Sequence, residues 1–209
     1  FIDADDIWEE NKLKKQITLF ENKRVGVVYG NLWIYNERAK KKKIFSKIKL
    51  LSGSIFDEIF SDYRVGIITS VIRRNILIKN YLSFNPKYNH IGDFDLFVNL
   101  SKICEFGAIQ EPVATYRIHG ENLSLKNSTQ EIMELKYWFE INKKSLNKTQ
   151  KQQFLIRLTN REFINFKLND TFFKSLKFFI KQKSLWKYLK NYLFLLLPLS
   201  ILKKFLWYQ

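Results

Sequence analysis

Runs of apolar residues in the first part of the chain predict buried strands. Residues 25–29 form a β-branched run that ends at Gly30-Asn31 and predicts a strand, and residues 33–35 either continue it or pair with it. Residues 66–72 have the same character, and residues 112–117 predict extended structure that closes the domain. Phe1-Ile2 directly precedes an acidic turn, and this order predicts the end of another buried strand.

Helical spacing of apolar residues appears between and beyond these runs. The first predicted helix carries three such positions, Leu13, Ile17 and Phe20, with the polar Gln16 at the same spacing. Residues 56–63 predict a helical turn, and residues 93–104 predict a helix that begins near Gly92. Residues 38–43 are basic and have no apolar periodicity, which predicts a solvated loop.

The distribution of these signals predicts the domain organisation. Strands and helices are mixed up to about residue 125, and beyond Ser124 the signals are almost all helical. A mixed pattern followed by helices alone indicates an α/β domain in residues 1–125 and a mostly helical extension in residues 126–209. A hydrophobic content of 46% suffices for a core, so wholesale disorder is not expected.

Charge is concentrated in the helical extension. The chain carries a formal net charge of +16, and residues 151–209 contain twelve Lys or Arg against two Asp or Glu. Lysines lie between apolar stripes from residue 171 onward, which favours an interfacial helix on an anionic membrane surface. The apolar run at residues 192–199 is too short to span a bilayer. Packing on the α/β domain or on a partner is the alternative.

The same basic and aromatic composition also suits a nucleic-acid-binding protein, because such residues track phosphates and stack on bases. The aromatic residues follow helical apolar stripes, however, and no RNA- or DNA-reading motif is present, so we expect no nucleic-acid partner. The single cysteine, Cys104, excludes an intramolecular disulfide and fits a reducing compartment.

Three carboxylates within four residues, Asp3, Asp5 and Asp6, form the first candidate site. They repel one another unless a cation or hydrogen-bond donors are present, and hard oxygen ligands at a strand end suit Mg²⁺ or Mn²⁺. The alternative is structural: Asp6 is placed to cap the next helix, with Glu9 completing a capping box.

Two further candidates come later in the chain. Asp93, in the sequence Gly-Asp-Phe-Asp-Leu, lies at a predicted helix start, where it serves either as a general base or as an N-cap. His119 can complete a metal shell with its imidazole, and Arg117 can hold a phosphate or a carboxylate. Each signal alone has an ordinary structural explanation.

Taken in order, these segments resemble family 2 glycosyltransferases of the GT-A fold. The resemblance covers residues 1 to about 124. It rests on five ordered matches: Phe1-Ile2-Asp3-Ala4-Asp5-Asp6-Ile7-Trp8 with Lys12-Leu13 and Gln16; Val25 to Asn31; Thr69-Ser70-Val71-Ile72-Arg73-Arg74; Phe84-Asn85-Pro86 with Gly92-Asp93-Phe94-Asp95-Leu96-Phe97; and Glu111 to Gly120 with Asn122 and Ser124.

The resemblance implies the C-terminal portion of a Rossmann-like GT-A domain and an inverting transfer from a nucleotide-sugar to a hydroxyl of a glycan or lipid-linked sugar. It implies that Asp93 is the catalytic base. Mg²⁺ or Mn²⁺ and the donor diphosphate would be held by Asp5, assisted by Asp3 or Asp6, and by His119 and Arg117. The acceptor side would include Thr69, Ser70 and Arg73. The expected setting is polysaccharide or glycolipid synthesis, in the cytoplasm at the inner face of the membrane.

Two departures from the family pattern qualify this expectation. Gly92 stands where the family often has Glu before the base, so a secondary contact is expected to be absent. At roughly 30 residues per βαβ unit, the family's nucleotide-binding units do not fit ahead of Phe1. We therefore expect the chain alone to be inactive, and a non-catalytic remnant is a further reading.

Overall fold

The structure of the chain is a computed structural model, and it describes residues 1–119, 122 and 128–169. The chain divides into two compact units, Phe1–Asn127 and Ser128–Gln209. The predicted boundary at residues 125 and 126 lies outside the described residues. So does the basic extension from residue 171 onward, whose predicted membrane role stays a prediction.

The first unit is built on a sheet whose central strand is β2 (Val25–Asn36). Its first eight residues are all buried, as the β-branched run predicts. β5 (Glu105–Ile118) pairs with β2 in parallel, whereas β3 (Lys41–Ile44) and β4 (Val71–Ile72) pair with it antiparallel. β1 (Ile7–Trp8) adds an edge to β5 in an antiparallel register. The fold is thus mixed α/β, consistent with a partial Rossmann-like glycosyltransferase domain.

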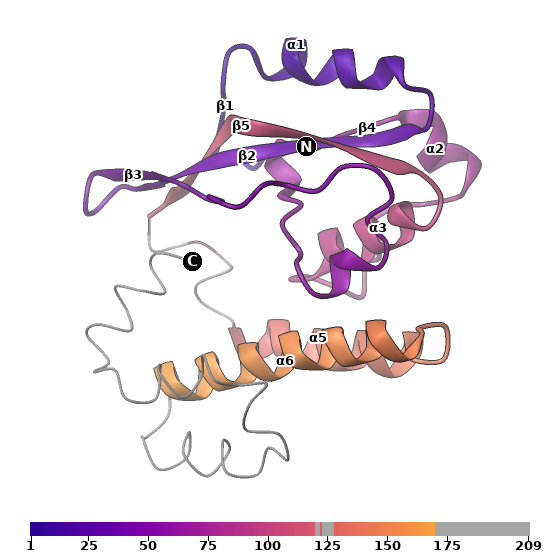
Figure 1. The fold of residues 1–209 in the computed structure, drawn as a ribbon. Helices are drawn as coiled ribbons and strands as arrows, with labels where there is room; N and C mark the ends of the chain where they lie inside the picture. Colours follow the sequence, from indigo (N-terminus) through magenta and orange to yellow (C-terminus); the bar gives the residue numbers. More distant parts are fainter. Residues whose placement is uncertain (120–121, 123–127, 170–209) are drawn as a thin grey trace. The chain divides into compact units, whose positions relative to one another are not determined.

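Helices cover both faces of this sheet (Figure 1). α1 (Lys12–Ile17), extended by the short helix η1 (Thr18–Glu21), runs along one face, and α3 (Gly92–Ser101) lies on the other. Six of the ten residues of α3 are buried, including Phe94 and Phe97. The helix predicted from Gly92 is therefore confirmed.

Short elements complete the first unit. They are η2 (Glu58–Phe60), η3 (Ile67–Thr69) and α2 (Arg74–Lys79). Gly26 of β2 is where α2 and the end of α3 approach the strand: a Cβ there would lie 2.4 Å from Ile76 Cδ1 and 2.5 Å from Cys104 Sγ. Only glycine leaves room for this packing.

Three predictions of local structure are wrong. Phe1 and Ile2 are about half exposed and belong to no strand, because Phe1 packs edge-on against Phe84 instead. Residues 66–72 contain η3 and only two strand residues. The basic run at residues 38–43 is not all loop, because its second half forms β3 by pairing with β2.

The first helix is present, but its buried face differs from the predicted one. Leu13 and Ile17 are 43% and 61% exposed, whereas Lys12 and Gln16 are buried. Gln16 Nε2 donates to the backbone oxygens of Val28 and Thr69, at 3.2 and 2.7 Å. The helix therefore packs through polar side chains that satisfy backbone acceptors beneath it.

The described part of the second unit is a pair of helices, α5 (Ser128–Asn142) and α6 (Lys148–Asn169). They pack through a stack in which the Phe154 ring lies 5.3 Å from Trp138 and 5.2 Å from Phe139. Among the described residues, no helix is long and apolar enough to cross a membrane.

Candidate active site

The acidic segment is folded against the C-terminal part of β5. The Asp6 backbone N–H donates to the Asp3 carbonyl oxygen at 3.2 Å and closes a turn, after which β1 pairs Ile7 with Thr115. This pairing fixes the carboxylates beside residues that are more than 100 positions away in the sequence.

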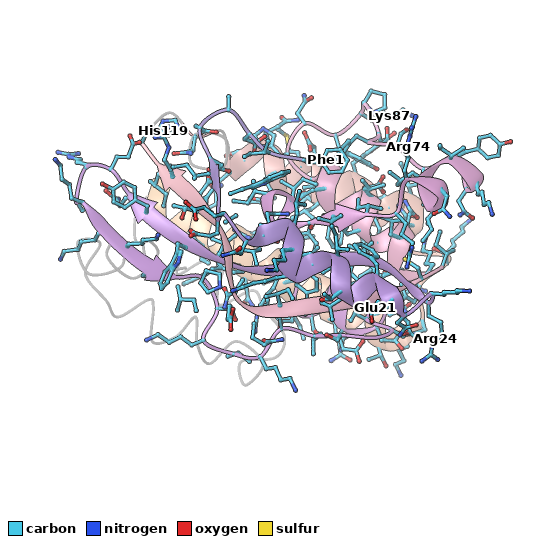
Figure 2. The ribbon with its side chains drawn as sticks, turned by 90° about the horizontal axis from the view of Figure 1, so that it is seen from above. Phe1, Glu21, Arg24, Arg74, Lys87 and His119 are labelled. Atoms are coloured by element: carbon cyan, nitrogen blue, oxygen red, sulfur yellow. The ribbon has the colours of Figure 1, made fainter. Side chains whose placement is uncertain are left out.

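Asp5 and His119 meet at this edge of the sheet. Asp5 Oδ2 and His119 Nε2 lie 2.7 Å apart, and the two side chains are 35% and 24% exposed. His119 lies just beyond the end of β5 (Figure 2). The hydrogen bond with His119 is the main reason that the pKa of Asp5 lies below its usual value. The proximity that the resemblance requires of this pair is therefore present.

Asp6 is held differently. Its Oδ1 accepts a hydrogen bond from the Arg117 backbone N–H at 3.0 Å, whereas its Oδ2 is buried and has no hydrogen-bond partner among the described residues. Burial raises the pKa of Asp6 to about 6. The capping alternative is wrong, because Asn11 is the N-cap residue of α1. Asp6 instead fastens the acidic turn to β5.

Arg117 and Asn122 fix the end of β5 around this turn. Arg117 Nε donates to the Asp5 carbonyl oxygen, and its Nη1 lies 3.4 Å from Glu37 Oε1. Asn122 Nδ2 donates to the Arg117 carbonyl oxygen, and Asn122 Oδ1 accepts from the His119 backbone N–H. Arg117 thus binds a carboxylate of the protein itself and supports the backbone of Asp5.

The donor atoms at this edge fit a hard divalent cation only in part. Within the described ranges, no three His, Cys, Asp or Glu side chains are grouped to hold a metal, so the predicted set of Asp5, Asp6 and His119 is not assembled. Asp5 and His119 supply two adjacent donors, a carboxylate oxygen and a ring nitrogen, and the unpartnered Asp6 Oδ2 is a further carboxylate oxygen nearby in sequence. Mg²⁺ commonly takes one or two protein carboxylates and completes its shell with water and substrate phosphates.

Asp93 lies in the first turn of α3. Its Oδ2 accepts a hydrogen bond from the Tyr63 hydroxyl at 2.8 Å, and its Oδ1 accepts one from the Phe94 backbone N–H at 2.7 Å. The N-cap residue of α3 is Ile91, so the capping alternative for Asp93 is wrong. The carboxylate is half-buried and oriented by a phenol from a different segment.

Phe84 connects the acidic segment with the start of α3. Its ring centroid lies 5.1 Å from that of Phe1 in an edge-on contact. Its Cδ1 lies 3.7 Å from where a Cβ on Gly92 would stand. The segment that opens with Phe1 and the helix that carries Asp93 therefore share one neighbouring side chain.

The three residues predicted to bind the acceptor have bonds within the protein. The hydroxyls of Thr69 and Ser70 both donate to the Gly66 carbonyl oxygen, at 2.7 and 2.8 Å, and both residues are buried. Arg73 Nε donates to the Val25 carbonyl oxygen at 2.8 Å, and its Nη2 donates to that of Phe20. Their structural role is evident, and their acceptor role stays a prediction.

Sequence reasoning missed two supporting residues. Tyr63 was assigned only to a helical turn, and Glu37 was not singled out. Tyr63 is 30 positions from Asp93, and Glu37 is 80 positions from Arg117, so no local pattern links either residue to its partner. Asn122 was part of the resemblance, but its function as a backbone brace was not foreseen.

The fold is consistent with a partial Rossmann-like glycosyltransferase domain, and one comparison with known proteins supports this. No family model matches the sequence. The chain is similar to the Escherichia coli UDP-Glc:alpha-D-GlcNAc-diphosphoundecaprenol beta-1,3-glucosyltransferase WfgD, with 29% identity over 109 residues. The match covers 52% of this chain and 40% of that relative, so it spans well under half of the relative's length. This similarity supports a general glycosyltransferase role.

Proposed function

We propose that this chain is the acceptor-side part of an inverting family 2 glycosyltransferase, which transfers a sugar from a nucleotide-sugar to a hydroxyl. The observation that carries the proposal is the 2.7 Å approach of Asp5 and His119, which are 114 positions apart. His119 follows the carboxyl end of β5, and ligands of open α/β sheets bind outside the carboxyl ends of the strands.

Asp93 acts in this proposal as the general base. It takes the proton from the acceptor hydroxyl while the hydroxyl oxygen bonds to the anomeric carbon from the face opposite the nucleotide. The bond between that carbon and the diphosphate oxygen breaks, and the nucleoside diphosphate leaves with the electron pair. Attack from the opposite face inverts the anomeric configuration. Tyr63 positions the carboxylate for this proton transfer.

Asp5 and His119 are the residues that would hold Mg²⁺ or Mn²⁺, with Asp3 and Asp6 adding negative charge beside them. A divalent ion bound there supplies Lewis-acid stabilisation of the charge on the leaving diphosphate. Arg117 and Asn122 keep the Asp5 backbone and the His119 backbone in place. The hydrogen bond from Arg117 to the Asp5 carbonyl oxygen and the two bonds of Asn122 to the His119 and Arg117 backbones pre-organise the donor side.

The name of the similar Escherichia coli protein supports our proposal for the substrate class. Its name specifies UDP-glucose as donor and a diphosphoundecaprenol-linked GlcNAc as acceptor. We extend to this chain a nucleoside-diphosphate sugar and a lipid-linked sugar hydroxyl, in cell-surface polysaccharide or glycolipid synthesis. An acceptor of this kind requires the protein to work peripherally at a membrane, which we place at the cytoplasmic inner face.

The donor side can be tested by Mn²⁺ binding to the 209-residue chain, measured by electron paramagnetic resonance. Asp5→Asn and His119→Gln should each weaken Mn²⁺ binding by about 10-fold or more, because each removes one of two protein donors. Glu111→Gln is the matched control: it removes an exposed carboxylate from the same strand and should leave binding unchanged. Equal binding by all three variants would contradict the proposal. Metal binding without sugar transfer by the native-length protein would instead favour the non-catalytic remnant.

A further inference from the structure

One surface of the first unit is both basic and apolar. Residues 63–92 contain five Lys or Arg and no Asp or Glu. The exposed members of this stretch include three charged and three apolar or aromatic residues. We call them the α2 surface: Arg74, Ile78, Lys79, Tyr81, Phe84 and Lys87.

The apolar part of the α2 surface is unusually exposed for residues of its kind. Ile78 is 60% exposed, Tyr81 95% and Phe84 41%. Tyr81 follows α2 with a φ of 52°, in the left-handed region that a bulky side chain rarely adopts. This conformation belongs to the C-terminal cap of α2, in which the Tyr81 and Leu82 backbone N–H groups donate to the Ile78 and Leu77 carbonyl oxygens, and the cap leaves the Tyr81 ring exposed.

The charged part comes from the same short stretch of the chain, at positions 74, 79 and 87. Arg74 and Ile78 are four positions apart, so they lie on the same face of α2. Figure 2 labels Arg74 and Lys87 close together in that view, on the side of Phe1 away from His119. Arg74, Lys79 and Lys87 form no ion pair with any described residue. A surface with three cations and no carboxylate in the same stretch complements an anionic partner.

We propose that the α2 surface is a contact site for an anionic phospholipid bilayer. Aromatic and aliphatic side chains enter the interfacial region, while Lys and Arg reach the lipid phosphates. The aliphatic Ile78 distinguishes this partner from a nucleic acid, since bases stack on aromatic rings and gain little from an isoleucine. Phe84 joins this surface to Gly92 at the start of α3, so the bilayer contact adjoins the helix that carries Asp93.

If the proposed function holds, a lipid-linked acceptor would reach the Asp93 side of the site from the bilayer. The role of the α2 surface in catalysis therefore rests on the proposed function. The contact itself can be measured without sugar transfer, so the two proposals fail separately. It is also independent of the basic extension beyond residue 170, because it concerns a different part of the chain.

A site-specific probe tests where the bilayer touches. In the full chain with Cys104→Ala, Tyr81→Cys is labelled with an environment-sensitive fluorophore, and Ile48→Cys is the control. Ile48 is 67% exposed and is flanked by Lys47 and Lys49, so it matches the α2 surface in character but follows β3. Phosphatidylglycerol-containing vesicles should shift the emission to the blue at position 81 and not at position 48.

Charge variants sharpen the test. Arg74→Gln with Lys79→Gln should raise the lipid concentration for half-maximal shift by about 10-fold at low salt, since each cation near an anionic surface strengthens attachment severalfold. Lys47→Gln with Lys49→Gln removes the same charge and should change it little. The proposal is overturned if the chain sediments with vesicles and position 81 shows no shift. It is overturned equally by a shift with oligouridine instead of vesicles, or by a shift that rises with protein concentration alone.

Discussion

Two polar clusters in the first unit pair their side chains in different surroundings, one buried and one at the surface. Lys12 and Gln16 of α1 are buried, and their hydrogen bonds end on each other and on carbonyl oxygens of the sheet. Asp5 and His119 contact each other at the surface, and both remain partly exposed. The first cluster is closed within the protein, whereas the second is open to a ligand.

This difference separates structural from chemical roles better than residue type does. Thr69 lies in the closed cluster, since its carbonyl oxygen accepts from Gln16 and its hydroxyl donates to Gly66. Burying such groups is tolerable because they are hydrogen-bonded. Asp93 belongs with the open groups: it is oriented by Tyr63, yet it is only half-buried. Substitutions in the two kinds of cluster should therefore affect different properties.

The largest effect is expected at Asp93. Asp93→Asn keeps the shape and the acceptor oxygen but removes the base, so turnover of the native-length protein should fall by about 10²–10⁴-fold. Its free energy of unfolding and its Mn²⁺ affinity should change little. Turnover with a radiolabelled nucleotide-sugar and urea denaturation measure the two properties. Near-normal turnover would move the base elsewhere, with Asp95 as the next candidate.

The closed cluster should respond in stability and not in chemistry. Burial lowers the pKa of Lys12 from 10.5 to about 8, so between these values the unfolded chain binds more protons than the folded one. The stability of the wild type, relative to Lys12→Met, should therefore rise by about 2 kcal/mol as the pH increases from 8 to 10.5. Below pH 8 the cost of the buried ammonium is fully present.

Urea denaturation of both proteins at pH 7.5 and pH 10 measures this change. Lys14→Met is the control, because Lys14 is exposed on the same helix and should give a difference that does not vary with pH. If the stability difference between the wild type and Lys12→Met is also independent of pH, the Lys12 ammonium is solvated. The cluster is then not closed.

Much of the fold could be predicted because its strongest elements carry strong local signals. β2 is a continuous β-branched run, and α3 combines helical periodicity with a clear start. β3 could not be predicted, because Lys41–Ile44 is extended only through its pairing with β2. The face of α1 was predicted only in part: Gln16 is buried as its spacing indicates, but Leu13 and Ile17 are exposed. Gln16 bonds to carbonyl oxygens of segments that the helix sequence does not contain.

The candidate site was predictable only as far as its residues resemble a family. The sequence offered Asp5 and His119 as separate weak signals, and their approach depends on the pairing of β1 with β5. The unpartnered oxygen of Asp6 and the brace from Asn122 arise from three-dimensional packing. Such contacts leave no periodicity or spacing in the chain, so they had to await the structure.

The smallest effect is expected from Tyr63, whose hydroxyl donates a hydrogen bond to Asp93. Tyr63→Phe removes the hydroxyl that donates to Asp93 Oδ2 but keeps the ring, which packs edge-on against Phe94 with centroids 5.2 Å apart. A hydrogen bond to an ionised carboxylate contributes about 1.5 kcal/mol or more, so turnover should fall by about 10-fold or more. Because the lost donor favoured the ionised carboxylate, the acidic limb of the pH–rate profile should move to higher pH. If Tyr63 has a purely structural role, Tyr63→Phe should lower stability and leave the pH–rate profile in place. That outcome would show that Tyr63 does not act through Asp93.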